Sequence, residues 1–305
     1  MLVFSETTAG LPPSQSRRDL EASTQTARLL GLRVYSLEPD FERCGDAEGA
    51  LAHVSVQPSV VPAVWIGYIP TRRRYREIYR AARRRRVQLI NSPAQFTRAM
   101  EFKGFYSRLS ELTPASLLVS RVEDCPRAVE KLGLPLFVKG TVQSQKQKGW
   151  KACVVETVEQ LERRCQAYLA QPEWTRGPVV LRQLVTLRHS RTTPEGFPIG
   201  REYRAFLLGG SVLACGYYWE GDDPLKALTA AEQGEVEELA REAARRMKVP
   251  YLAVDIGQTT EGRWIVIETG DAQFCGLCEI PRWELWSRLA QQLQSGSGPG
   301  RARSL

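Results

Sequence analysis

The sequence of 305 residues contains no long apolar run. A membrane-spanning helix needs about 20 consecutive apolar residues, and no stretch approaches that length. The segment Met1 to Glu6 also lacks the basic region and the long apolar region of a secretory signal. Cysteine is sparse, and its odd number of seven residues is spread through apolar segments, which is typical of reduced core thiols. These absences predict a cytoplasmic protein without a membrane partner.

The familiar signatures of metal and nucleotide sites are missing too. The chain has two histidines, and the pair Cys275 and Cys278 has no second Cys-x-x-Cys pair that could complete a zinc site. We therefore interpret the two cysteines as packing thiols. Neither a GxxxxGK(S/T) loop nor a GxGxxG segment occurs. If a nucleotide binds, another architecture must hold it.

The net charge of +8 comes from one short segment. Residues 72–86 contain nine arginines and a single acid, Glu77, which together account for the whole excess. The spacing predicts a helix with one apolar face, formed by Tyr75, Ile78, Tyr79 and Ala82. A surface helix with a solvated basic side is the favoured interpretation. The alternative is a surface that contacts phosphates or RNA.

The remaining pattern divides the chain into an α/β part and an α+β part. Up to residue 93, short apolar runs alternate with helical patterns, as in parallel-sheet units. A helix is predicted over 94–112, where Thr113-Pro114 ends it. The later segments predict strands at 115–119, 135–139, 153–155, 179–185, 203–218 with a turn at Gly209-Gly210, 251–256 and 263–268, and helices at 127–132, 158–170 and 229–247.

Three carboxylates stand in or beside the apolar strands of the predicted hairpin. Asp255 and Glu268 each follow an apolar run, and Asp271 comes three residues after Glu268. A buried carboxylate requires a cation or hydrogen bonds, and Mg²⁺ is typically held by one or two carboxylates together with phosphate oxygens. The hairpin therefore predicts a magnesium site. Ordinary strand-end acids paired with arginines are the alternative.

Single cations interrupt or end three other apolar strands. Lys139 follows Leu136-Phe137-Val138, and Arg182 and Arg204 lie within further apolar segments. Lysine and arginine converging from separate strands suit a polyanion such as a triphosphate. The polar loop between Gly140 and Gly149, which carries Ser144, Lys146 and Lys148, is expected to close over phosphates.

Together these residues resemble the ATP-grasp superfamily over residues 103–278. The order and spacing of five elements carry the resemblance: Lys103 with Thr113-Pro114, Phe137-Val138-Lys139-Gly140, Val180 to Val185, Glu202 to Gly210, and Asp255 with Ile267 to Asp271. Two positions depart from the family pattern. Gln183 replaces a common acid, and Gly270 stands where asparagine is expected, so either Asp271 supplies the second metal ligand or a second metal is lost.

The resemblance implies a fold and a division into domains. The expected architecture is an α/β pre-ATP-grasp domain followed by an α+β ATP-grasp fold of two lobes. Residues 1–93 would form the first domain, 94–178 the small lobe with its connecting helix, and 179–294 the large lobe. Residues 295–305, rich in glycine and serine, are expected to form a disordered tail.

The resemblance also implies ADP-forming, magnesium-dependent ligation of a carboxylate to an amine through an acyl phosphate. ATP would bind at Lys103, Lys139, Ser144, Lys146, Arg182, Gln183, Leu184 and Val185. Mg²⁺ would bind at Asp255, Glu268 and Asp271, with Arg204 and Arg182 as catalytic residues. The implied partners are small-molecule or peptide carboxylates and amines. The alternatives are a phosphotransferase or nucleic-acid-modifying protein that uses Arg72 to Arg86, and a nucleotide-binding module without catalysis.

Overall fold

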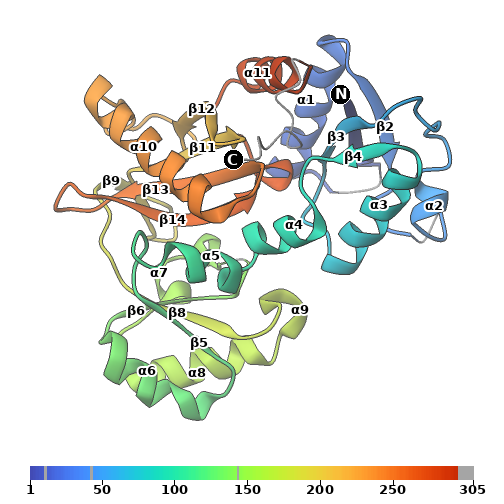
Figure 1. Ribbon diagram of the computed structural model, residues 1–305. Coiled ribbons are helices and arrows are strands. Elements are labelled where there is room, and N and C mark those ends of the chain that lie inside the picture. The colour runs from blue at the N-terminus through green and yellow to red at the C-terminus, as the bar shows by residue number, and fades with distance from the viewer. Residues whose placement is uncertain (10–11, 42–43, 143, 295–305) are drawn as a thin grey trace, which may run out of the picture.

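The computed structural model describes residues 1–9, 12–41, 44–142 and 144–294. Three sheets of four strands and one small hairpin make up the β structure of this part of the chain (Figure 1). The predicted disordered tail, residues 295–305, lies outside the described residues.

The N-terminal sheet is parallel, as the alternating pattern predicts. Its strands are arranged in the order β2-β1-β3-β4. They are β1 (Leu2–Glu6), β2 (Arg33–Leu37), β3 (Val61–Ile66) and β4 (Val87–Leu89), connected by α1 (Gln15–Leu29), α2 (Ala47–Ala50) and α3 (Arg72–Arg84). Trp65 and Tyr75 stack in its core with a centroid separation of 5.7 Å.

The arginine-rich segment forms α3, and Thr71 caps its first turn through a bond from the Arg74 amide. Tyr75, Ile78 and Ala82 are fully buried against the sheet. The predicted apolar face is therefore confirmed, and most of the arginines lie on the opposite, exposed side.

The helix predicted over residues 94–112 is wrong in one respect, because two helices occupy the segment. These are α4 (Pro93–Met100) and α5 (Phe102–Leu109). Glu101 between them is extended, with φ −108° and ψ 135°. Its carboxylate pairs with Arg72, and the following amide, of Phe102, donates to the carbonyl of Thr141. These tertiary bonds favour a break that the local pattern does not reveal.

The second sheet has the order β5-β8-β6-β7 with antiparallel neighbours. Its strands are β5 (Ser116–Val119), β6 (Leu136–Lys139), β7 (Val154–Val155) and β8 (Val179–Gln183), accompanied by the helices α6 (Cys125–Leu132), α7 (Trp150–Cys153), α8 (Val158–Leu169) and α9 (Pro172–Thr175). Buried side chains of α6 and α8 share one apolar core with this sheet. The predicted boundary between residues 178 and 179 separates β8 from the strands with which it pairs.

The third sheet is antiparallel with the order β12-β11-β13-β14. Its strands are β11 (Glu202–Leu208), β12 (Ser211–Tyr217), β13 (Tyr251–Gln258) and β14 (Trp264–Asp271), and it is preceded by the hairpin β9 (His189–Thr192) and β10 (Pro198–Gly200). The predicted turn at Gly209-Gly210 is confirmed, since both glycines have positive φ angles. So is the predicted hairpin that becomes β13 and β14.

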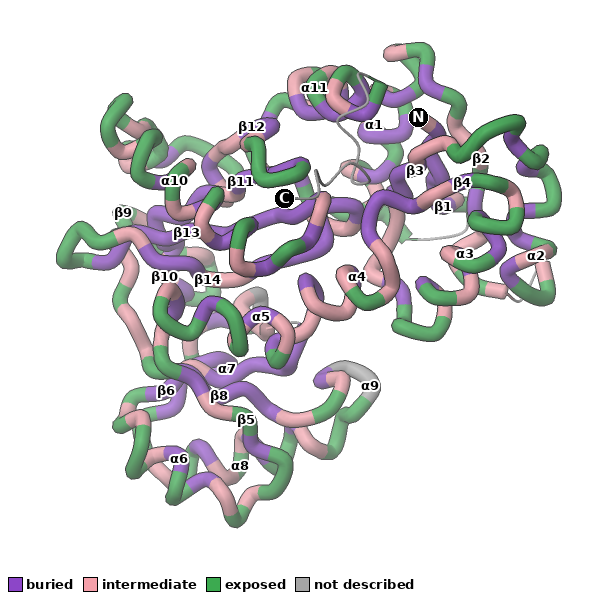
Figure 2. The backbone as a smooth tube through the Cα atoms, viewed as in Figure 1, coloured by how far each residue is buried: buried purple, intermediate pink, exposed green. Residues whose placement is uncertain are grey.

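Helices cover both faces of the third sheet. Helix α10 (Ala230–Met247) packs on one face together with α5, and α11 (Arg282–Gln294) packs on the other together with α1. The strands of this sheet are almost continuously buried (Figure 2). Short 3₁₀ turns occur at Val122–Asp124, Lys146–Lys148 and Ala272–Phe274. No described helix is long and apolar enough to cross a membrane.

Candidate nucleotide site

Two adjoining cavities lie where the second and third sheets face each other. The first cavity is bordered by the ends of β6 and β8, the segment after β8, the β9–β10 hairpin and β14. The second cavity is bordered by the 144–148 loop, β11, β13, β14 and residues 274–276. Both cavities are lined by Ser144, Lys146, Tyr218 and Glu268. The two spaces therefore form one continuous site.

Lys139, the last residue of β6, forms an ion pair across this site. Its side chain is only 5% exposed, and Nζ lies 2.6 Å from Oε1 of Glu268 on β14. Burial would raise the pKa of Glu268, but Lys139, Arg182 and Lys146 together hold that pKa below its ordinary value. Glu268 is therefore an ionised carboxylate beside the shared wall of the two cavities.

A second ion pair joins Arg204 on β11 to Asp255 on β13. The two residues face each other in the strand register. Nε and Nη2 of Arg204 donate to the two carboxylate oxygens at 2.7 and 2.8 Å, and Nη1 donates to the Gly276 carbonyl at 2.8 Å. Asp255 is also the register partner of Glu268. The sheet thus places two carboxylates side by side, each beside one cation.

Arg182 on β8 contributes a guanidinium that is incompletely bonded. Nε donates to Oγ of Ser116 at 3.2 Å, and Nη1 donates to the Ile267 carbonyl at 2.8 Å. Nη2 is buried and has no hydrogen-bond partner in the described part of the chain. A buried, unpaired donor costs about 1–3 kcal/mol and more when it is charged. Because Arg182 lines the first cavity, an anion there would satisfy Nη2.

The segment after β8 lines the inner side of the first cavity. The amide of Gln183 donates to the Ala115 carbonyl, whereas the backbone groups of Leu184 and Val185 make no hydrogen bond within the described residues. Phe137, Ile265 and Ile267 add apolar surface to the same cavity. An apolar slot with free amide and carbonyl groups suits a planar ligand with donors and acceptors along one edge.

Glu202 at the start of β11 also lines the first cavity, and the sequence analysis did not select it as a site residue. Its carboxylate is buried, and Oε2 lies 3.7 Å from Nζ of Lys146. Burial raises the pKa of Glu202. The strand period of two was an available signal, because it places Glu202 on the same face as Arg204.

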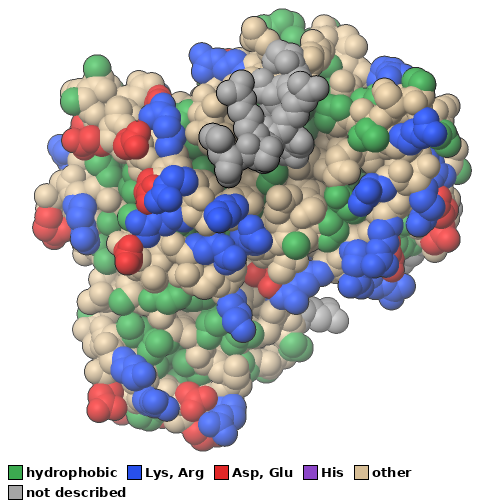
Figure 3. Space-filling model, viewed as in Figure 1, with side chains coloured by type: hydrophobic (Ala, Val, Ile, Leu, Met, Phe, Trp, Pro, Cys, Tyr) green, Lys and Arg blue, Asp and Glu red, His purple; other side chains and the backbone are tan. Residues whose placement is uncertain are grey.

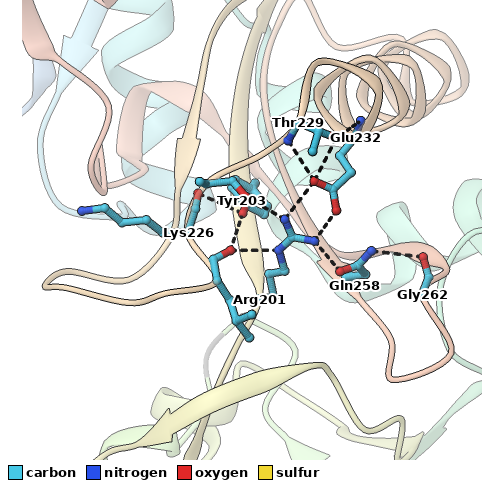
Figure 4. Close-up of polar contacts among 9 residues, drawn as sticks. Arg201, Tyr203, Lys226, Thr229, Glu232, Gln258 and Gly262 are labelled. Carbon is cyan, nitrogen blue, oxygen red and sulfur yellow. Dashed lines mark hydrogen bonds and ion pairs between the residues drawn. The ribbon is translucent and has the colours of Figure 1, made fainter.

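The neighbouring residue, Arg201, holds the start of β11 in place (Figure 4). Its guanidinium donates to Glu232 at the first turn of α10, to Oε1 of Gln258 at 2.6 Å, and to the carbonyls of Leu225 and Ala227. Arg201 points away from Glu202 because successive strand residues alternate. This network fixes the strand whose other face carries Glu202 and Arg204.

The structure separates Asp271 from the two carboxylates of the site, so the prediction of Asp271 as a metal ligand is wrong. Asp271 is fully buried, lines neither cavity, and accepts hydrogen bonds from the amide and side chain of Gln273. The strand period places Asp271 on the face opposite to Glu268. A side chain at position 270 would approach Sγ of Cys275 to 2.5 Å, so the expected asparagine has no room there. No group of three metal-binding side chains occurs among the described residues.

Lys103 is likewise placed apart from the cavities. It lies exposed on α5 and lines neither of them. By contrast, Lys139, Ser144, Lys146, Arg182, Gln183, Leu184 and Val185 all line the first cavity. Arg204 and Asp255 line the second cavity, and Glu268 lines both. The structure therefore brings together ten of the twelve residues selected from the sequence.

The arginines of the α3 segment form a different kind of surface. Five of them pair with acids: Arg72 with Glu101, Arg73 with Glu77, Arg74 with Glu6, and Arg84 and Arg85 with Glu48. Figure 3 shows blue side chains gathered over this helix. None of these arginines lines the two cavities described above. The paired, exposed arrangement supports the interpretation of a surface helix with a solvated basic side.

The comparison with protein families agrees with this geometry. A family model for the ATP-grasp domain, describing the third family of one clade of these domains, matches residues 131–289. This chain belongs to the ATP-grasp family. The match contains both ion pairs and the segment after β8. No curated protein matches the sequence significantly.

Solved ATP-grasp structures share the fold across nearly the whole chain. A D-alanine–D-alanine ligase from Bacillus anthracis in complex with ATP is 13% identical, with a TM-score of 0.64, and the alignment covers 96% of each chain. A RimK-domain ATP-grasp protein from Sphaerobacter thermophilus is 14% identical, with a TM-score of 0.59 and coverage of 96% of this chain and 99% of that chain. The ATP-grasp ligase PsnB in complex with a minimal precursor, Mg and ADP is 14% identical, with a TM-score of 0.55 and coverage of 96% and 98%.

Proposed function

We propose that this ATP-grasp protein is an ADP-forming, magnesium-dependent ligase that activates a carboxylate as an acyl phosphate and joins it to an amine. The observation that carries the proposal is the convergence of Lys139, Arg182 and Arg204 on two adjacent carboxylates, Asp255 and Glu268. Four different strands supply this set in addition to β6. The neighbouring structures in complex with ATP and with Mg and ADP support the same assignment.

In this proposal the first cavity holds the nucleotide. The adenine edge would pair with the backbone of Leu184 and Val185, between the apolar surfaces of Phe137 and Ile267. The triphosphate would extend toward the shared wall, where Ser144, Lys139 and Lys146 offer donors and Nη2 of Arg182 gains a partner. Lysine and arginine neutralise phosphate oxygens without a change in their own protonation.

The donor set at the shared wall fits a magnesium ion. Asp255 and Glu268 are adjacent across the strand register and would hold the ion together with phosphate oxygens and water. When bound, Mg²⁺ neutralises charge on the phosphate oxygens during phosphoryl transfer. With two carboxylates available, and with Asp271 facing the other way, the protein contributes ligands to one cation more readily than to two.

The second cavity would hold the reacting carboxylate. A carboxylate oxygen attacks the γ-phosphorus of ATP, the bond to the bridging oxygen of ADP breaks, and an acyl phosphate forms. An amine then attacks the acyl carbon and displaces inorganic phosphate. Arg204 lines this cavity and would stabilise negative charge on the transferred phosphoryl group. Asp255 orients that guanidinium through both of its oxygens.

The test is a screen for ADP release from Mg²⁺ and ATP with pairs of amino acids, peptides and simple amines. We expect at least one pair to stimulate ADP release, and we expect Lys139→Ala and Glu268→Ala to abolish it. Binding of ATP without stimulation by any acceptor pair would instead support a nucleotide-binding module without catalysis. Failure of the wild-type protein to bind ATP would contradict the proposal.

A further inference from the structure

A third cavity adjoins the second one, on the side of the N-terminal sheet. It is lined by residues of α1, by residues 66–69 after β3, and by residues 273–277. Four residues line both the second and the third cavity: Ile69, Phe274, Cys275 and Gly276. The proposed site for the reacting carboxylate therefore continues into a further space of about 310 Å³.

The charge of the third cavity differs from that of the second. The second cavity is lined by Lys146, Lys148 and Arg204. Asp19, on the second turn of α1, is the one charged side chain among the described residues that line the third cavity. Its Oδ1 accepts hydrogen bonds from Gln15 and Arg282, and its Oδ2 has no donor in the described part of the chain. This space therefore favours a cationic group over an anionic one.

Gly276 stands between Asp19 and Arg204. A methyl group added at Gly276 would lie 3.9 Å from Oδ2 of Asp19 and 3.9 Å from Nη1 of Arg204, with no closer neighbour. The two polar atoms are thus no more than twice that distance apart, and the absent side chain leaves the space between them open. An ammonium group and a carboxylate on one carbon atom can span this gap, since each charge-assisted hydrogen bond adds about 2.8 Å.

We infer that the carboxylate substrate is an α-amino acid with an apolar side chain, bound with its ammonium group at Asp19 and its carboxylate toward Arg204. This inference rests on the proposed function. Asp19 would keep the amino group protonated and distant from the acyl phosphate, so that a second molecule must supply the nucleophile. Space for the apolar side chain is bordered by Leu20, Ile66, Phe274 and Leu277.

Calorimetric titration tests the inference without turnover. The probes are both enantiomers of leucine and phenylalanine, N-acetyl-leucine, which lacks the ammonium group, and isoamylamine, which lacks the carboxylate. Each is titrated with and without Mg²⁺ and a non-hydrolysable ATP analogue. We expect at least one free amino acid to bind at least ten-fold more tightly than both truncated probes.

Three variants locate the binding site. Asp19→Asn keeps an acceptor for Arg282 but removes the charge, and Gly276→Ala fills the gap without a steric clash. Both should weaken amino-acid binding at least ten-fold and leave the affinity for the ATP analogue unchanged. Glu21→Gln, an exposed change of the same charge on the same helix, is the matched control and should have no effect.

Three results would overturn the inference: equal affinity for N-acetyl-leucine, binding within two-fold of wild type in Asp19→Asn, or no binding of any free amino acid. If the ATP analogue fails to bind, the proposed function fails. The titrations without nucleotide then decide the amino-acid site separately.

Discussion

Two regions of this molecule are rich in positive charge, and they are built in opposite ways. Helix α3 and its end carry nine arginines in fifteen consecutive residues, mostly exposed and paired with nearby acids. The shared wall of the two cavities collects single cations from β6, β8 and β11, which are far apart in the sequence. There the charges are buried and face carboxylates of β13 and β14.

The difference shows that charge density in a sequence is a poor guide to a binding site. A solvated guanidinium costs little to place on a surface, and its pairing with an acid contributes about 0–1 kcal/mol. A charge at the end of an apolar strand must leave water, so it persists only with a partner or a ligand. Isolated charges in apolar segments therefore carry more functional information than the arginine-rich helix.

The largest effect should follow from removing a buried cation of the shared wall. Lys139→Met keeps the length of the side chain but leaves Glu268 without its partner at 2.6 Å. We expect ADP release to fall by roughly 100-fold or more, in line with the loss of one electrostatic group at a phosphoryl-transfer site. Lys131→Met, an exposed lysine on α6, is the matched control. Activity within ten-fold of wild type would contradict the role of Lys139.

A smaller effect should follow from shortening the fork of Arg182. Arg182→Lys retains the charge but cannot bond Ser116 and Ile267 while also offering a donor to the cavity. We expect the affinity for an ATP analogue to fall about ten-fold, the equivalent of one lost charge-assisted hydrogen bond. The same change at the exposed Arg188 should alter the affinity less than two-fold. Equal effects at the two positions would remove Arg182 from the site.

Asp271 allows the comparison to be sharpened, since it is a buried charge outside the cavities. Burial raises its pKa to about 6, although hydrogen bonds from Asn91 and Gln273 oppose the rise. The folded state therefore holds a proton more tightly than the unfolded state, whose carboxyl titrates near 4. Stability should fall as the pH rises from about 4 to about 6 through this group, by roughly 3 kcal/mol in total.

Asp271→Asn should remove that contribution. Urea unfolding at pH 4 and pH 7 measures it as the difference between variant and wild type, with the exposed Asp222→Asn as the control. Identical pH dependence in Asp271→Asn and wild type would contradict the assignment. ADP release should persist in the variant, because Asp271 lines neither cavity.

The smallest effect is expected on α3. Arg76, Arg80 and Arg83 are exposed and form no ion pair with the described residues. Replacing all three with glutamine should change stability by less than about 0.5 kcal/mol per site and ADP release by less than about two-fold. RNA binding by the wild type that weakens steeply with salt and is lost in the triple variant would instead support the nucleic-acid interpretation.

The sequence was informative wherever a local period sets the structure. Apolar runs of period two predicted β11, β13 and β14, and a capping threonine with a helical period predicted α10. The same strands carried Arg204, Asp255 and Glu268 to the site. Their pairing followed from the antiparallel register, which a hairpin pattern largely determines.

Tertiary contacts account for what the sequence did not reveal. Glu101 breaks the connecting helix because of bonds to segments that are distant in the sequence. Asp271 was assigned by its nearness to Glu268 in the sequence, although an odd separation in a strand places two residues on opposite faces. The third cavity depends on α1 lying beside residues 273–277, and no local pattern encodes that contact.

The central claim is a magnesium-dependent nucleotide site on Glu268, and thermal unfolding tests it most directly. Wild type and Glu268→Ala are melted with a non-hydrolysable ATP analogue, with and without Mg²⁺. Because a ligand that binds the native state raises Tm by mass action, the account predicts a magnesium-dependent rise in the wild type that disappears in Glu268→Ala. A rise of equal size in both proteins, or no rise in the wild type, would contradict it.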